Sequence, residues 1–263
     1  MRVNTVFPFQ QTLLEHCGQM KYTVRPGVES YGHAVGILLV DCSTPFVPGD
    51  VGNASTYKYP VLYRTVPDVT LDRLINLGDE GLVQNVIDSA LDLQRMGVRA
   101  ITSDCGYMVR YQRQVAAALD TPVILSSLVQ LPMIEQTLGD HQKIGIICAN
   151  ARRLTPELLD IAGLRDPSKV VIRGLEECPN FRGPILDETG SLDQEAVEAE
   201  VVFTALGLVR SHPEVKVILL ECSNLPPYAA AVQAATGRMV FDFTTLIDFY
   251  QQATRRQRFT GIY

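Results

Sequence analysis

The chain has 263 residues, of which 46% are hydrophobic and 20% are charged. This composition supports a sizeable core and excludes a disordered or low-complexity protein. The 23 Lys and Arg residues against 29 Asp and Glu give a net charge of −6, and a mildly acidic chain without a long basic cluster is a poor match for nucleic acid. At about 150 residues per domain, the length predicts just under two domains.

The sequence predicts neither a membrane span nor a secretory signal. The longest apolar runs, 35–40 and 217–220, fall far short of the ~20 residues of a span, and residues 1–11 lack a charged region followed by an apolar core. The six cysteines, at positions 17, 42, 105, 148, 178 and 222, form no CxxC pair, and the four histidines have no zinc-binding spacing. We therefore expect a cytoplasmic protein with reduced thiols, no metal site and no membrane partner.

Short apolar segments alternate with helical segments along the chain. The predicted strands are 36–40, 98–103, 122–125, 143–149, 169–172 and 214–220. The predicted helices are 82–91, stopped by Gly97, then 126–138, then 156–162 with Thr155 as N-cap, and 191–210 with Ser191 and Gln194 placed for a capping box. Apolar strands without alternation are typical of a parallel sheet covered on both faces, so the predicted fold class is α/β.

A loop rich in Pro and Gly, 43–54, follows the first predicted strand. Its Pro-Gly-Asp-Val-Gly-Asn stretch, 48–53, has neither the Walker spacing nor a GxGxxG pattern, so a nucleotide site is disfavoured. Two interpretations remain open. The stretch is an ordinary turn, or it is a loop that closes on a substrate carboxylate with its backbone amides.

The sequence contains an internal repeat. Moved by 109 positions, residues 35–41 fall on 144–150, and moved by 117 positions, residues 98–124 fall on 215–241 without a gap. The second alignment matches Cys105 with Cys222 and Tyr111 with Tyr228. Two landmarks that nearly agree on one spacing predict two similar α/β halves.

The repeat places two cysteines at equivalent strand ends. Ligands of open α/β sheets bind beyond the carboxyl ends of the strands, so Cys105 and Cys222 are expected to face each other across one cleft. One thiol could then remove a proton from a carbon while the other delivers a proton to the opposite face. This needs a lowered thiol pKa, which the start of a helix after each strand could supply. The alternative is that each cysteine is simply a small buried hydrophobic residue.

Asp41, Cys105 and Cys222, with the segment Glu221-Cys222-Ser223-Asn224-Leu225-Pro226, resemble the aspartate/glutamate racemase superfamily. That group includes glutamate, aspartate and hydantoin racemases, maleate isomerase and arylmalonate decarboxylase. The resemblance implies two pseudo-symmetric α/β domains with parallel four-stranded sheets and a cofactor-free active site in the cleft between them. The implied first domain is 30–135 plus 226–263, the second is 136–225, and 1–29 is an N-terminal extension.

The function that the resemblance implies is a cofactor-independent racemase or epimerase, an isomerase, acting on an amino acid or related carboxylate. Cys105 and Cys222 would be its acid/base pair. The implied substrate-binding residues are Asp41, Asn150, Thr155, Gly106, Tyr107, Ser223 and Asn224. The alternatives are a maleate-isomerase-like or arylmalonate-decarboxylase-like enzyme on a small dicarboxylate, or an inactive ligand-binding relative. The expected partner is a small molecule, with a possible homodimer.

Two features depart from the family pattern. Acidic residues, Asp104 and Glu221, precede the two cysteines where the racemases usually have small residues. A carboxylate beside a thiol raises the thiol pKa, so we expect these side chains to be solvated, to join a polar network, or to hold a substrate ammonium. Tyr107 replaces a small polar residue, which narrows the expected carboxylate pocket and disfavours aspartate or glutamate as substrate.

Overall fold

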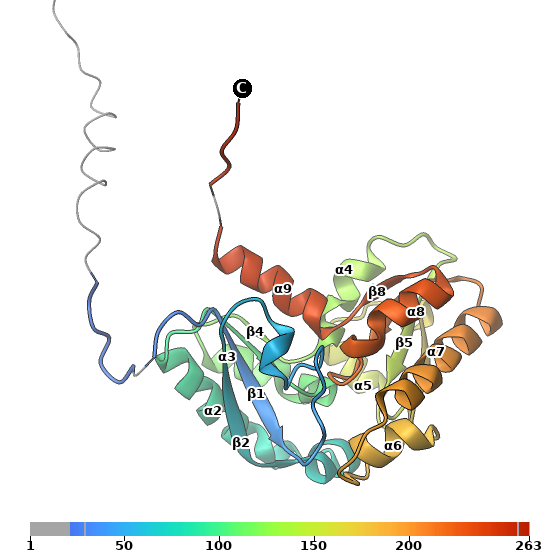
Figure 1. Cartoon of the computed structure of the whole chain (residues 1–263), viewed down its shortest axis with the longest axis horizontal. Helices are drawn as coiled ribbons and strands as arrows, with labels where there is room; N and C mark the ends of the chain where they lie inside the picture. Colours follow the sequence, from blue (N-terminus) through green and yellow to red (C-terminus); the bar gives the residue numbers. More distant parts are fainter. Residues whose placement is uncertain (1–21, 29, 257, 263) are drawn as a thin grey trace, which may run out of the picture.

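The computed structural model describes residues 22–28, 30–256 and 258–262, and within them the chain forms two four-stranded sheets in which all pairings are parallel. The first has the order β2-β1-β3-β4 and the second the order β6-β5-β7-β8. Figure 1 shows β1 and β2 in one half of the molecule and β5 in the other. The predicted fold class is confirmed.

The strands are short and mostly buried. Those of the first sheet are β1 (Val35–Asp41), β2 (Val61–Thr70), β3 (Ala100–Ser103) and β4 (Val123–Ile124). Those of the second are β5 (Lys143–Cys148), β6 (Val170–Gly174), β7 (Val215–Leu220) and β8 (Met239–Phe241). Because β1, β3, β5 and β7 are inner strands covered on both faces, they have the continuous apolar runs that the sequence shows.

Helices connect and cover these strands. The α-helices are α2 (Val83–Arg95), α3 (Gln112–Ala118), α4 (Leu131–Glu135), α5 (Pro156–Ile161), α6 (Pro179–Ile185), α7 (Gln194–Ser211), α8 (Ala229–Thr236) and α9 (Phe243–Thr254). Shorter helical turns are η1 (Ala54–Thr56), η2 (Asp72–Leu77), η3 (Glu80–Leu82), η4 (Gly106–Tyr111), η5 (Ser127–Gln130), η6 (Pro167–Lys169) and η7 (Pro226–Tyr228). None of the helices in the described part is long and apolar enough to cross a membrane.

The internal repeat corresponds to a repeated packing arrangement. A Cβ on Gly36 in β1 would lie 2.9 Å from Leu93 of α2, and a Cβ on Gly145 in β5 would lie 2.6 Å from Leu208 of α7. Glycine at these two matched positions therefore lets a helix leucine contact the central strand of each sheet. The shift of 117 positions places β3 and β4 at the positions of β7 and β8, so the two halves are built alike.

Several local expectations differ from the structure. The sequence pattern predicted neither β2 nor β8. The expected helix 126–138 is divided into η5 and α4, and a proline lies in the first turn of α4. The long helix begins at Gln194 with Asp193 as its cap, whose carboxylate accepts the Ala196 N–H, so the predicted Ser191 cap is wrong. Asp193 occupies the position from which a side chain reaches the third helical N–H.

The C-terminal segment 226–263 contributes to both halves. Its strand β8 pairs with β7 in the second sheet, whereas Phe243 and Ile247 of α9 pack with Val35 and Ile37 of the first sheet. Helix α9 also contacts β3 of the same sheet. The expected assignment of this whole segment to the first domain therefore does not hold for β8. The other domain limits stay a prediction, and most of the expected N-terminal extension lies outside the described residues.

Candidate active site

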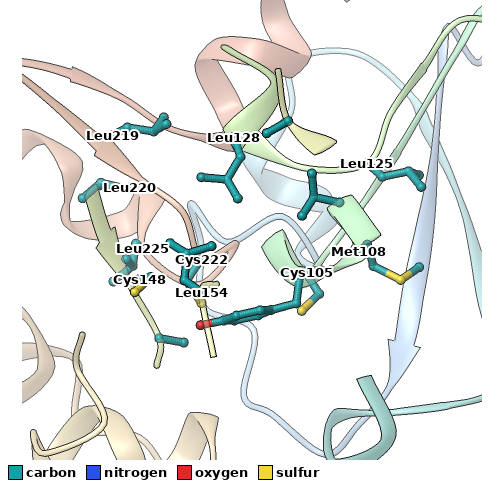
Figure 2. Close-up of a cluster of buried hydrophobic side chains, with 14 of the residues drawn as sticks. Cys105, Met108, Leu125, Leu128, Cys148, Leu154, Leu219, Leu220, Cys222 and Leu225 are labelled. Carbon is teal, nitrogen blue, oxygen red and sulfur yellow. The ribbon is translucent and has the colours of Figure 1, made fainter. Parts of the chain in front are cut away.

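A cavity lies where the carboxyl ends of the two sheets meet. It encloses about 390 Å³ of empty space, counting its opening to solvent. Its lining residues are Val40, Cys42, Thr44, Phe46, Leu71, Ile75, Asp104, Cys105, Gly106, Tyr107, Ala149, Ile185, Leu186, Glu221, Cys222, Ser223 and Asn224. Figure 2 shows Cys105 and Cys222 entering one cluster from different elements.

The two predicted cysteines line this cavity together. Cys105 follows β3 and Cys222 follows β7, and each is 7% exposed. The backbone N–H two residues further on, at Tyr107 and Asn224, favours the thiolate of each. Burial nevertheless raises the pKa of both thiols well above the ordinary value, and the charge of Glu221 is the next cause. Desolvation therefore outweighs the expected lowering of the thiol pKa by the start of a helix, and both groups are thiols in the unliganded site.

Three buried carboxyl groups surround the thiols. Burial raises the pKa of Asp104 to about 8, of Glu221 to about 8 and of Asp50 to about 7. We expected Asp104 and Glu221 to be solvated or networked. The structure instead buries both, because the two cysteine motifs pack against each other, with Gly106 against Glu221 and the Ser223 hydroxyl bonded to the Asp104 carbonyl. Neither Glu221 oxygen nor the Asp104 Oδ2 makes a hydrogen bond, although the Asp104 Oδ1 accepts the Val40 N–H at 2.8 Å.

The position of Glu221 requires a glycine at position 106. A Cβ at position 106 would lie 1.9 Å from the Glu221 Oε1 and 2.5 Å from its backbone oxygen. A side chain after Cys105 is thus excluded by the carboxyl group that precedes Cys222. The acidic residue of one cysteine motif and the glycine of the other thus form one packing arrangement.

The loop that follows β1 is attached to the second cysteine motif. The Asn224 Nδ2 donates to the Asp50 Oδ2 at 2.6 Å, and the Cys222 thiol donates to the Asn224 Oδ1 at 3.4 Å. The Val51 N–H donates to the Ser223 carbonyl at 3.3 Å, and the Ser223 hydroxyl donates to the Asp104 carbonyl. The stretch 48–53 therefore supports the Cys222 motif. Asp50 was not predicted as a site residue. Its place between Gly49 and Gly52, in a loop expected at the cleft, could have indicated it.

The other predicted site residues are divided between this cavity and its surroundings. Tyr107 is buried and joins the halves, because its hydroxyl donates to the Asn150 carbonyl at 2.7 Å and accepts the Asn150 N–H at 3.0 Å. Asn150 itself lines a neighbouring polar pocket. Asp41 and Thr155 are exposed and do not line the cavity. Their predicted place at the site is therefore not supported.

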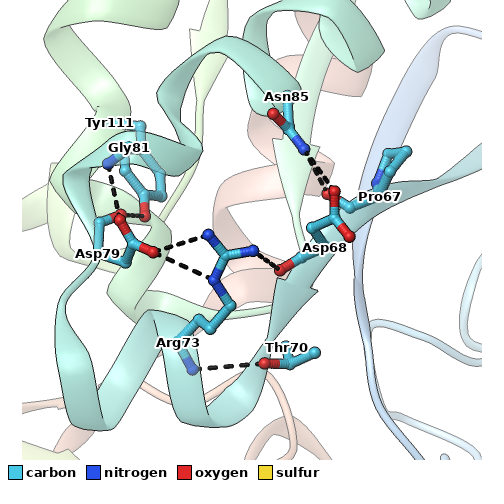
Figure 3. A network of polar contacts seen from close by, with 8 residues as sticks. All are labelled: Pro67, Asp68, Thr70, Arg73, Asp79, Gly81, Asn85 and Tyr111. Atoms are coloured by element: carbon cyan, nitrogen blue, oxygen red, sulfur yellow. Dashed lines mark hydrogen bonds and ion pairs between the residues drawn. The ribbon is translucent and has the colours of Figure 1, made fainter.

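One wall of the cavity is held by an arginine. Leu71 and Ile75 reach the cavity from the start of η2, and Figure 3 shows the polar contacts that hold this turn. The Arg73 guanidinium donates to the Asp79 carboxylate at 2.8 and 3.1 Å and to the Asp68 carbonyl at 3.2 Å. The Tyr111 hydroxyl donates to the Asp79 carbonyl at 2.5 Å, which connects this wall to η4 beyond Cys105.

The cavity has an unusual charge composition. Among the described residues that line it, acidic side chains are present while lysine, arginine and histidine are absent. The same part of the chain contains no group of three His, Cys, Asp or Glu side chains suited to a metal ion. The described cysteines are all free thiols, and Cys17 lies outside the described residues. The polar groups that line the cavity are therefore thiols, carboxyls, hydroxyls and amides.

The sequence has close relatives among characterised proteins. No family model matches it. It is 34% identical over 225 residues to a dimethylsulfoniopropionate lyase of Durusdinium sp. clade D, covering 82% of this chain and 73% of the relative. It is 32% identical over 222 residues to dimethylsulfoniopropionate lyase 7 of Emiliania huxleyi, covering 81% of this chain and 64% of the relative. The chain thus spans less than two thirds of this second relative.

Solved structures share the fold at low sequence identity. A mutant of arylmalonate decarboxylase has a TM-score of 0.57 at 15% identity, covering 84% of this chain and 92% of that one. Allantoin racemase from Pseudomonas fluorescens also has a TM-score of 0.57, at 16% identity, covering 86% of this chain and 99% of that one. These likenesses confirm the fold of the aspartate/glutamate racemase superfamily.

The relatives correct the predicted activity. They are named lyases, so the expected racemase or epimerase function, and with it the isomerase class, is wrong. The two cysteine motifs therefore predicted the fold correctly but not the reaction. With the fold of the aspartate/glutamate racemase superfamily, the chain belongs to the dimethylsulfoniopropionate lyase family.

Proposed function

We propose that the chain is a lyase that releases dimethyl sulfide from dimethylsulfoniopropionate. This substrate carries a carboxylate at one end and a positively charged dimethylsulfonium group at the other. The observation that carries the proposal is the cavity itself, in which two thiols lie beside buried carboxyl groups and none of the described lining residues has a cationic side chain. Such a site suits a ligand that is itself cationic and has an acidic C–H bond.

The reaction is a β-elimination. A thiolate takes a proton from the carbon next to the carboxylate, and the C–H electron pair forms the new double bond. The bond from the neighbouring carbon to sulfur breaks, and its electrons stay on sulfur. The products are acrylate, neutral dimethyl sulfide and a protonated thiol, which returns its proton to solvent. A racemase also begins by removing a proton beside a carboxylate, which explains how one fold can serve both reactions.

Cys105 and Cys222 are the proposed acid/base groups. One acts as base, and the other donates a hydrogen bond to the charge that develops on the substrate carboxylate. Their raised pKa values mean that a thiolate must form in the complex. A sulfonium beside the thiol favours this ionisation, because an opposite charge lowers a thiol pKa. Ser223 and Asn224, with the backbone amides after each cysteine, are the proposed carboxylate donors.

The test is turnover of dimethylsulfoniopropionate, with dimethyl sulfide measured by gas chromatography and acrylate by proton NMR. Cys105→Ser and Cys222→Ser are each expected to lower kcat/KM by about 100-fold or more. Cys178→Ser is the matched control, because Cys178 is a thiol outside the cavity and contacts Thr204 at 3.8 Å. Folded, reduced protein that releases neither product would refute the proposal, as would equal losses in all three variants.

A further inference from the structure

Glu221 is a buried acid that makes no side-chain hydrogen bond, although the nearby Ala149 N–H favours its charged form. Its side chain is fully buried, and neither carboxyl oxygen makes a hydrogen bond. It lines the cavity and lies against Gly106, directly beside Cys105, while its own chain neighbour is Cys222. Its charge raises the pKa of both thiols. Glu221 is thus adjacent to both reacting groups.

The other two buried carboxyl groups are partly occupied by the protein. Asp50 accepts the Gly52 N–H at 2.9 Å through one oxygen and the Asn224 amide at 2.6 Å through the other. Asp104 accepts the Val40 N–H through one oxygen. A buried polar group that makes no hydrogen bond destabilises the folded state. Glu221 bears this cost at both oxygens, whereas a hydrophobic side chain could fill the same space.

We propose that Glu221 is the counter-ion that selects a substrate with a positively charged group, and that it contacts the sulfonium directly. The inference rests on the proposed function for the identity of that cation. Within the cavity, Glu221 is the carboxyl group whose two oxygens are both free to receive it, and no lysine, arginine or histidine among the described lining residues competes for its charge. The ring of Tyr107, which is buried close to Glu221, offers a second surface suited to an onium group.

Cation binding and the ionisation of Glu221 are coupled. Burial raises the pKa of this carboxyl to about 8, so the unliganded group is largely protonated at neutral pH. An onium group at the carboxyl favours the charged form and releases the proton. The other titratable groups around it are Cys105, Cys222, Cys148, Tyr107, Asp104 and Asp50. None of these can supply positive charge.

The test compares two ligands of the same shape that cannot release dimethyl sulfide. One is β-alanine betaine, whose trimethylammonium group is cationic. The other is the acid in which a tert-butyl group replaces that ammonium. Isothermal titration calorimetry should give a dissociation constant about tenfold or more lower for the cation with the wild-type protein. Glu221→Gln should reduce this ratio to less than about threefold, and the shorter Glu221→Asp should reduce it partly.

Asp104→Asn is the matched control, because it neutralises a second acid of the same cavity and is expected to keep most of the cation preference. Circular dichroism melting establishes that each variant is folded, and Glu221→Asp carries the comparison if the Gln variant does not fold. The inference is overturned if the wild-type protein does not prefer the cation, or if the folded Glu221 variants keep the wild-type preference. Turnover of dimethylsulfoniopropionate by the same preparations separates the two proposals, since cation preference without turnover refutes the lyase function alone.

Discussion

Replacing Gly106 by alanine tests the contact between the two cysteine motifs. The new Cβ would lie 1.9 Å from the Glu221 Oε1 and 2.4 Å from its Cδ, and rotation of the Glu221 side chain can relieve both contacts. The third contact, 2.5 Å from the Glu221 backbone oxygen, cannot be relieved in this way. The Glu221 N–H is bonded to the Ile147 carbonyl at 2.8 Å, which holds this backbone in the second sheet. The strain must therefore separate the two halves locally.

Overpacking of a core typically costs about 1–3 kcal/mol, and a fixed backbone contact places this substitution near the upper end of that range. For a chain of this size about 3 kcal/mol corresponds to a melting temperature lowered by roughly 6–12 °C, measured by circular dichroism. Lyase activity should fall as well, because Glu221 and Cys105 are both displaced.

Gly207→Ala is the matched control for this substitution. Gly207 is exposed within α7, and an added Cβ there meets no atom within 4 Å. Alanine in a helix interior should raise stability by about 0.5–1 kcal/mol. If Gly106→Ala melts at the wild-type temperature, or if both variants shift alike, the proposed packing of Gly106 against Glu221 is refuted.

Two further predictions concern the buried acids and their partners. The folded-state pKa of Glu221 is about 8 against an ordinary value of 4.5, so the folded protein binds more protons than the unfolded chain between these pH values. The free energy of unfolding should therefore fall as pH rises through this window and level off above it. Thermal unfolding across the window should show this slope, and Glu221→Gln should reduce it; an unchanged slope would contradict the assignment. Asn224→Ala removes the donor to Asp50 and the acceptor for the Cys222 thiol, so stability should fall by about 1–3 kcal/mol and lyase turnover should drop about tenfold or more. Wild-type stability and turnover in this variant would show that the link between the loop and the cysteine motif is unimportant.

The inner strands could be predicted from the sequence and the edge strands could not. Inner parallel strands are covered on both faces, so β1, β5 and β7 have continuous apolar runs that identify them. The edge strand β2 is largely half-buried or exposed and includes Arg64 and Pro67, so its pattern resembles a loop. The other edge strand that was missed, β8, has only three residues.

The candidate site was predictable where the repeat marked it. Cys105 and Cys222 were matched by spacing, and they line one cavity. The surrounding acids were not predictable, because whether a carboxyl is buried depends on which part of the other half covers it. Asp41 illustrates this point: the pairing of β1 with β2 shifts register between Leu39 and Asp41, and the side chain at the end of the strand is exposed.

The burial of the paired thiols determines which cysteines a reactive chemical modifies first. Cys105 and Cys222 are 7% exposed, whereas Cys42 and Cys178 are partly open to solvent. An alkylating agent or peroxide in bulk water therefore encounters the outer cysteines first. Modification of the paired thiols should therefore be slower, because little of either residue is reached from solvent. Oxidants at low concentration are expected to modify Cys42 and Cys178 first and to leave the paired thiols reduced.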